Sequence, residues 1–262
     1  ILLYAAKVSL YPKDALREMR HPVKMSFAPS VSIGMVLISA ALIDSVPGVS
    51  RALWLAGAGL QLILSLAIMR EWVVRDHFEI VHASPSWFIP AVGNLVVPLA
   101  GMRFAPLDVS WFYFSSGIVM WGVLLAIVLS RAIFHRSLPE KLLPTLFILM
   151  APPSVGFLVY VRLTGGLDSF GRVLFFFAAF MFLFLATLAG RFFRIRFSLS
   201  WWAYSFPLAA FSLATGLMAG LTGSFFYHAL SVLLWAALVL IVAVLAVKTL
   251  GAVAGREICV ED

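Results

Sequence analysis

The amino-acid sequence predicts an all-α integral membrane protein built from helix hairpins. Of its 262 residues, 63% are hydrophobic and only 12% are charged, whereas soluble domains are typically about 45–50% apolar and about 25% charged. The apolar residues gather into eight runs, each close to the roughly 20 residues that a spanning helix needs. Proline recurs in every second run, and because proline interrupts a helix this indicates pairs of one broken and one regular helix.

The eight predicted spans have short connections and no Asp, Glu, Lys or Arg in their interiors. We expect one transmembrane domain over residues 1–262, in which residues 25–247 form four hairpins and 248–262 form a cytoplasmic tail. Residues 1–8 resemble the end of a truncated helix that runs into a basic cytoplasmic loop at 9–24. The spans are expected at about 25–44, 52–70, 86–102, 109–130, 142–162, 173–190, 199–222 and 225–247.

The prolines follow a repeat of about sixty residues. Pro29, Pro90, Pro153 and Pro207 each stand beside an aromatic residue or methionine, in the stretches SFAPS, WFIPAVG, MAPPSVG and YSFPLAAF. Proline removes a backbone N–H and frees the carbonyl one turn earlier. In hydrocarbon such groups must be satisfied by protein or by a water-lined cavity. Four broken helices in equivalent positions therefore predict an inner ring around one central pathway, with the regular helices outside.

Neutral side chains cluster at the four breaks. Such hydroxyl and amide groups often only hold helices together, and phenylalanines often only fill the core. As a repeated set they also suit a mildly polar pore, which an ion leaves easily because it does not bind tightly. Phe206, directly before Pro207, is the candidate gate. The predicted pore-lining residues are Phe27, Pro29, Ser30, Phe88, Pro90, Asn94, Pro153, Ser154, Phe157, Ser205, Pro207 and Ser212.

Acidic residues are confined to the ends of the spans, as at Asp44, Glu71 and Asp108. Proton-coupled carriers commonly use an intramembrane Asp, Glu or His as a relay. The lack of such a residue favours passive permeation over active transport. A neutral wall does not fix the sign of the ion, although basic residues at the pore mouth would concentrate anions there.

Several other classes of function find no support in the sequence. The single cysteine, Cys259, and five scattered histidines lack the spacing of a metal site, and no phosphate-binding glycine loop or nucleophile elbow occurs. We therefore expect no enzyme activity, metal or cofactor. The net charge of +7 comes from basic residues in short loops, which is a topology signal rather than a sign of nucleic-acid binding.

The basic residues also predict the orientation. Of the 19 Lys and Arg residues, only Arg51, Arg103, Arg162 and Arg172 fall at one end of the spans, and the other 15 fall at the opposite end. Because cytoplasmic loops carry the excess of positive charge, the end with 15 should be cytoplasmic. We expect a multi-pass protein of the inner (plasma) membrane with its C-terminus inside.

The stretches HPVKMSFAPS, SPSWFIPAVGN, MAPPSVGF and especially WWAYSFPLAAFSLAT resemble the tellurite-resistance/dicarboxylate transporter family, from about residue 21 to 220. That family includes bacterial TehA and the plant guard-cell slow anion channels. The resemblance implies ten helices as five hairpins in quasi-fivefold arrangement, a pore of proline-kinked inner helices, and often a homotrimer. It also implies an occluding phenylalanine, which would correspond to Phe206. The four hairpins here would be the second to fifth.

The expected function is a membrane anion channel that passes small monovalent anions such as chloride and nitrate down their gradient. The partners are then small inorganic anions and membrane lipid. Members of the family differ in role, so the resemblance leaves an alternative open: a secondary carrier for C4-dicarboxylates such as malate, or for oxyanion or tellurite-related export. A membrane scaffold without transport is a third class.

Overall fold

The computed structural model describes residues 21–22, 24–76, 78–135, 138–192 and 194–255. These residues form helices and no strand, and eight helices are long and apolar enough to cross a membrane. This confirms the all-α membrane fold. Predictions for residues 1–20 lie outside the described residues. The spans are Lys24–Leu42, Pro47–Val74, Pro85–Phe104, Leu107–Phe134, Glu140–Thr164, Ser169–Thr187, Leu199–Thr222 and Phe225–Ala254.

The chain divides into two compact units. Unit 1 covers residues up to 137 together with 159–165, and unit 2 covers 138–158 and everything from 166 onward. Unit 1 contains the 3₁₀ helices η1 (Lys24–Phe27), η2 (Ile80–His82), η3 (Pro85–Trp87) and η4 (Gly93–Val96), and the α-helices α3 (Ser30–Leu42), α4 (Pro47–Val74), α5 (Phe88–Val92), α6 (Pro98–Phe104) and α7 (Leu107–Phe134).

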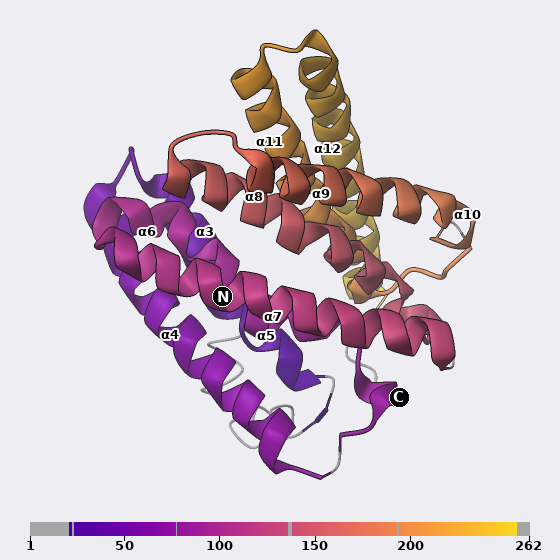
Figure 1. Ribbon diagram of the computed structural model, residues 1–262. Helices are drawn as coiled ribbons and strands as arrows, with labels where there is room; N and C mark the ends of the chain where they lie inside the picture. Colours follow the sequence, from indigo (N-terminus) through magenta and orange to yellow (C-terminus); the bar gives the residue numbers. More distant parts are fainter. Residues whose placement is uncertain (1–20, 23, 77, 136–137, 193, 256–262) are drawn as a thin grey trace. The chain divides into compact units, whose positions relative to one another are not determined.

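Unit 2 contains two 3₁₀ helices and most of the remaining α-helices, and α8 is divided between the two units after Leu158. The pair α11 and α12 pack side by side, as Figure 1 shows. They are joined at Gly223, whose φ of 66° suits glycine and closes the end of α11. The elements are η5 (Glu140–Met150), α8 (Ala151–Thr164), α9 (Ser169–Thr187), α10 (Ala189–Phe192), η6 (Leu199–Tyr204), α11 (Ser205–Thr222) and α12 (Phe225–Ala254).

The four predicted breaks share one local structure. In each broken span a 3₁₀ segment comes first, and an α-helix begins within two residues of Pro29, Pro90, Pro153 or Pro207. Each proline therefore lies at the N-cap or in the first turn of an α-helix, rather than in the middle of one. The first-turn N–H groups have no intrahelical acceptor, so proline costs little there. The tighter 3₁₀ turn supplies the interruption.

The partners of the broken spans are continuous α-helices, namely α4, α7, α9 and α12. Between 39% and 72% of residues in the apolar windows of the broken spans are buried, but only 11% to 33% in the continuous ones. This difference supports the assignment of inner broken and outer regular helices. Pro47 falls at the first position of α4, where it starts the helix without interrupting it.

Most span boundaries differ by a few residues from the sequence-based expectation, and α4 begins at Pro47 rather than near residue 52. Two of the differences change how a residue or segment is interpreted. Helix α12 continues to Ala254, past the expected end of its span at 247. Arg131, expected in a loop, lies in the last turn of α7 with only 4% of its surface exposed. Both differences arise because an α-helix extends into the headgroup layer after its apolar run has ended, and sequence hydropathy marks only the apolar run.

Candidate functional site

A chain of buried polar groups connects the first two breaks within unit 1. The hydroxyl of Ser32 lies 2.7 Å from both the Pro29 carbonyl oxygen and Gln61 Oε1, and donates its single proton to one or the other. Gln61 Nε2 donates in turn to the carbonyl of Pro90 and to Ser65 Oγ, both at 3.1 Å. All three side chains are at most 2% exposed. The amide of Gln61 therefore bridges α3 to the break at Pro90.

The carbonyl of Pro90 illustrates how the break is satisfied. It accepts from Gln61 and from Ser65 Oγ at 2.5 Å, and Ser65 Oγ also lies 3.3 Å from Asn94 Oδ1. Protein side chains thus supply the hydrogen bonds that the helix itself no longer makes, as the bilayer requires. Of the predicted pore-lining residues, Pro90 and Asn94 are brought together here, through Ser65 on the outer helix α4.

Side chains along one face of α4 contact the backbone of the second break. Trp54 Nε1 donates to the carbonyl of Val97 at 3.0 Å, just beyond η4. An added Cβ at Gly93 would lie 2.8 Å from Gln61 Nε2, so only glycine leaves room for the amide. Small and polar residues at such a contact let helices approach closely. This face of α4 therefore acts as a polar support for η4.

In unit 2, aromatic rings rather than buried amide and hydroxyl groups pack against the break at Pro207. Tyr204, at the end of η6, has the ring of Phe147 at 4.6 Å, Phe192 at 5.9 Å and Trp201 at 6.0 Å. Aromatic pairs at these separations and edge-on angles are favourable. The α-helix that carries Phe206 and Pro207 starts directly after this cluster. Its first turn is therefore anchored by ring packing and not by a buried amide.

The four phenylalanines at the breaks fall into two groups. Phe88 and Phe157 are buried, at 2% and 0% exposure, and the Phe157 ring packs 5.4 Å from Phe175. Phe27 and Phe206 are 41% and 36% exposed. Phe206 makes no ring contact among the described residues. Core packing thus accounts for the first pair, and the two exposed rings remain as gate candidates.

The predicted pore-lining hydroxyls already have partners in the backbone. Ser154 donates to the Met150 carbonyl at 2.7 Å and Ser205 to the Trp202 carbonyl at 2.7 Å. Ser212 reaches the Ser231 carbonyl of α12 at 3.3 Å. Ser30 is exposed at the start of α3, whereas Pro29, Pro153 and Pro207 are buried. To contact an ion or water in a pore, these hydroxyls would either accept a hydrogen bond through an oxygen lone pair or give up the backbone carbonyl to which they donate.

The residue three positions before the break proline carries a buried donor at three of the four breaks. Ser26 Oγ, Trp87 Nε1 and Tyr204 Oη are each buried without a hydrogen-bond partner in the described residues. An unsatisfied buried donor costs about 1–3 kcal/mol. Such neutral O–H and N–H groups can donate a hydrogen bond to water or to an anion. Trp87 and Tyr204 were absent from the predicted pore set.

Charge is almost absent from the buried parts of the described spans. Arg131 is the single charged residue among the buried polar side chains, and its Nε has no partner there. The carboxylate nearest a span interior, Glu71, pairs with Arg70 at 3.8 Å and with Arg75. Asp44 and Asp108 are exposed. No group of three His, Cys, Asp or Glu side chains occurs in the part of the chain that is described.

A small titratable cluster precedes the first break in unit 1. Partial burial lowers the pKa of His21 below its usual value of 6.5, and the nearby charges of Lys24 and His82 lower it further, against a backbone hydrogen bond that raises it. His21 Nδ1 accepts from the backbone N–H of Lys24 at 3.3 Å, which requires the unprotonated nitrogen. His21 is therefore neutral near pH 7.

Sequence reasoning missed the residues on the outer helix, namely Ser65, Gln61 and Trp54, as well as Ser32 on α3. A signal was present, because Gln61 and Ser65 stand one turn apart on the same face as Trp54 and Ala58. In an apolar span, such a polar i, i+4 pair indicates a helix contact. The prediction treated the continuous spans as lipid-facing and so did not use it.

Comparison with known proteins agrees with this architecture. The chain is 29% identical over 253 residues to the S-type anion channel SLAH3 of Arabidopsis thaliana, covering 95% of this chain and 39% of that protein. It is 26% identical over 248 residues to an uncharacterized transporter of Methanocaldococcus jannaschii, covering 85% of this chain and 72% of the other. It is also 26% identical over 231 residues to the tellurite resistance protein TehA homolog of Haemophilus influenzae, covering 87% and 67%.

The chain thus spans less than half the length of the plant channel and about two thirds of the archaeal and bacterial relatives. Residues 1–250 match the family described as "SLAC1: Voltage-dependent anion channel". This match covers nearly the whole chain and includes all four breaks, and families of this kind consist of channels and transporters rather than enzymes. This multi-pass membrane protein belongs to the SLAC1/TehA family of anion channels and transporters.

Proposed function

We propose that this protein is an anion channel that passes small monovalent anions, such as chloride and nitrate, down their gradient. The observation that carries the proposal is the lack of any buried carboxylate among the described residues, in a protein whose four inner spans are interrupted. An ion that meets neutral walls binds weakly and leaves quickly. The neutral donors beside the breaks, at Ser26, Trp87 and Tyr204, suit an anion rather than a cation.

The gate in this proposal is the ring of Phe206, with the break at Pro207 placing it. The support is its exposure of 36% in a region where the other rings pack against one another. An anion that passes a ring in a narrow path must shed water, and unpaired charge in an apolar site is costly. The predicted pore-lining set, the homotrimer and the cytoplasmic C-terminus remain parts of the proposal.

The proposal is tested by anion flux through purified protein in liposomes, with and without an imposed proton gradient. We expect chloride and nitrate to move only downhill, at a rate that the proton gradient leaves unchanged. Protein-free liposomes give the background rate. Proton-driven accumulation of malate or another anion against its gradient would overturn the channel and favour the carrier. A complete lack of flux would overturn both.

A further inference from the structure

The segment between α9 and α11 in unit 2 presents an exposed row of arginines. Arg191 lies in α10, and the backbone N–H of Arg194 donates to the Arg191 carbonyl at 3.2 Å, which turns the chain. Arg191, Arg194 and Arg196 are exposed, while Phe192 and Ile195 between them are buried at 9% and 8%. The buried side chains of Phe192 and Ile195 anchor the segment, and the arginine side chains beside them stay exposed.

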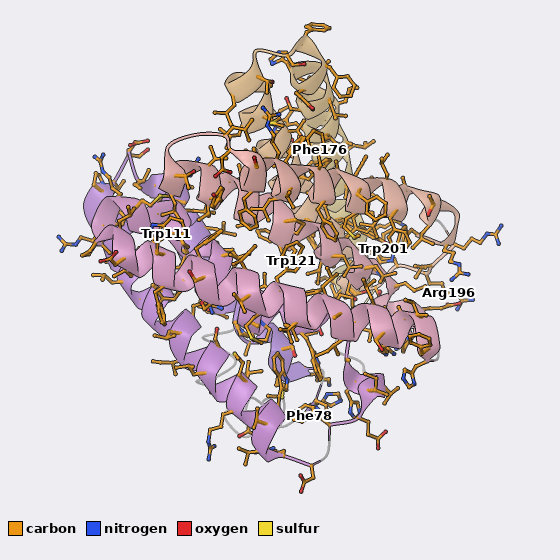
Figure 2. All side chains as sticks on the ribbon, viewed as in Figure 1. Phe78, Trp111, Trp121, Phe176, Arg196 and Trp201 are labelled. Atoms are coloured by element: carbon orange, nitrogen blue, oxygen red, sulfur yellow. The ribbon has the colours of Figure 1, made fainter. Side chains whose placement is uncertain are left out.

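A lysine from the last helix lies over two aromatic rings, here called the aromatic floor, that follow Arg196 in the chain. Lys248 Nζ lies 5.6 Å from the centre of the Trp201 ring and 5.8 Å from that of Phe197. These are cation–π distances, and the two rings are themselves 5.7 Å apart and edge-on. Trp202 Nε1 donates to Thr249 Oγ1 at 3.0 Å and so fixes α12 against η6. Figure 2 labels Trp201 on this floor and Arg196 at the outer edge.

The positive charge of this group is not neutralised within the described part of unit 2. Two carboxylates belong to that part, Asp168 and Glu140. Asp168 caps the other end of α9 through the N–H of Gly171 at 2.9 Å, about 28 Å away along a 19-residue helix. Glu140 stands next to Lys141. The four cations Arg191, Arg194, Arg196 and Lys248 form no ion pair with a described carboxylate.

The depth of the group in the membrane follows from the length of α12. That helix begins at Phe225 and has 30 residues, about 45 Å, whereas the hydrocarbon layer is about 30 Å thick and takes about 20 residues. Lys248 therefore falls just beyond the hydrocarbon, at the level of the lipid headgroups. Tryptophans such as Trp201 and Trp202 are typical of that level.

We propose that Arg191, Arg194, Arg196 and Lys248 form a binding site for the headgroup of an acidic phospholipid. The phosphate accepts hydrogen bonds from the guanidinium groups and the ammonium group. The acyl chains lie along the exposed apolar side of α12, which includes Val244 at 42% and Val247 at 70% exposure. The free charge, the aromatic floor and the adjoining apolar surface select a lipid over soluble phosphate. The site does not depend on which ion the protein transports.

The test is retention of phosphatidylglycerol by the purified protein, measured by native mass spectrometry after reconstitution with equal phosphatidylglycerol and phosphatidylcholine. We expect the variant Arg194→Gln/Arg196→Gln/Lys248→Gln to retain several-fold less phosphatidylglycerol, with phosphatidylcholine unchanged. The matched control is Arg51→Gln/Arg103→Gln/Arg162→Gln, which removes the same charge from the opposite ends of the spans and should retain both lipids. Lys248→Arg alone should also retain both.

Two outcomes would overturn the site. If both triple variants lose phosphatidylglycerol equally, total charge rather than this group recruits the lipid. If excess inorganic phosphate displaces the lipid completely, the group recognises phosphate in any form. Because Arg196 is exposed, Arg196→Gln alone serves if the triple variant does not fold, and it too must lower retention. Anion flux measured on the same samples separates failure of this site from failure of the channel.

Discussion

At the scale of single residues, the gate is the sharpest prediction. Replacing Phe206 by Ala removes the ring and keeps the bend at Pro207, so we expect anion flux in liposomes to rise at least about tenfold. A tenfold rise needs only about 1.4 kcal/mol less barrier, a small part of the cost of stripping water from an ion. Phe206→Leu should rise less, because more bulk remains.

The matched control for the gate is Phe27→Ala, which removes an equally exposed ring from another break. Unchanged flux in that variant, with faster flux in Phe206→Ala, identifies the ring at Pro207. The gate assignment fails if Phe206→Ala folds normally and conducts like the parent. A rise in Phe27→Ala instead would move the gate to the first break.

His21 makes the stability of unit 1 depend on pH. Its pKa is lowered in the folded protein, so the unfolded chain binds the proton more readily. His21 therefore costs stability as the pH falls below about 6.5, until the lower folded pKa is reached. Between pH 8 and pH 5, we expect the midpoint temperature of unfolding to fall less for His21→Asn than for the parent. His228→Asn, in the first turn of α12, is the control and should behave like the parent.

At the scale of elements, much of the fold was predictable. All eight spans, the alternation of broken and continuous helices and the positions of the breaks follow from apolar runs and proline, because these act locally. The 3₁₀ character of the segments before the prolines was not predicted, since it depends on how each first turn packs. The support from Gln61 and Ser65 was missed for the same reason, because it arises only when α4 meets η4.

The support of η4 by α4 has a measurable consequence. Gln61→Leu keeps the volume but leaves the Pro90 carbonyl with Ser65 alone and leaves Ser32 with only the Pro29 carbonyl as acceptor. We expect a loss of about 0.6–2 kcal/mol in unfolding free energy, the range found for hydrogen bonds between membrane helices. Leu66→Ala, on the lipid side of the same helix at 59% exposure, should change stability less. Equal stability of Gln61→Leu and the parent in a detergent unfolding series would show that the bridge is dispensable.

At the scale of the whole molecule, the candidate site was only partly predictable. The breaks and Phe206 follow from the family resemblance and the repeat, whereas the contribution of each pore-lining residue depends on distances between helices that a sequence does not contain. Phe88 and Phe157 show this: both were predicted to line the pore beside a break, yet both rings are buried. The burial of Arg131 was equally hard to predict, because this charged residue stands at the end of an apolar run and becomes buried only when the helix continues past it.

The orientation of the chain in the membrane is the prediction at this scale. Nearly all Lys and Arg residues fall at one end of the spans, and translocation of positively charged loops is disfavoured, so that end should be cytoplasmic. Cys259 is first replaced by Ser, and single cysteines are then introduced at Ser137, Ser198 or Val49. A membrane-impermeant thiol reagent added to intact cells should label Val49→Cys and miss Ser198→Cys and Ser137→Cys. Permeabilised cells, in which all three should react, control for access. Labelling of Ser198→Cys but not Val49→Cys in intact cells would reverse the orientation, and with it the leaflet in which the acidic lipid is bound.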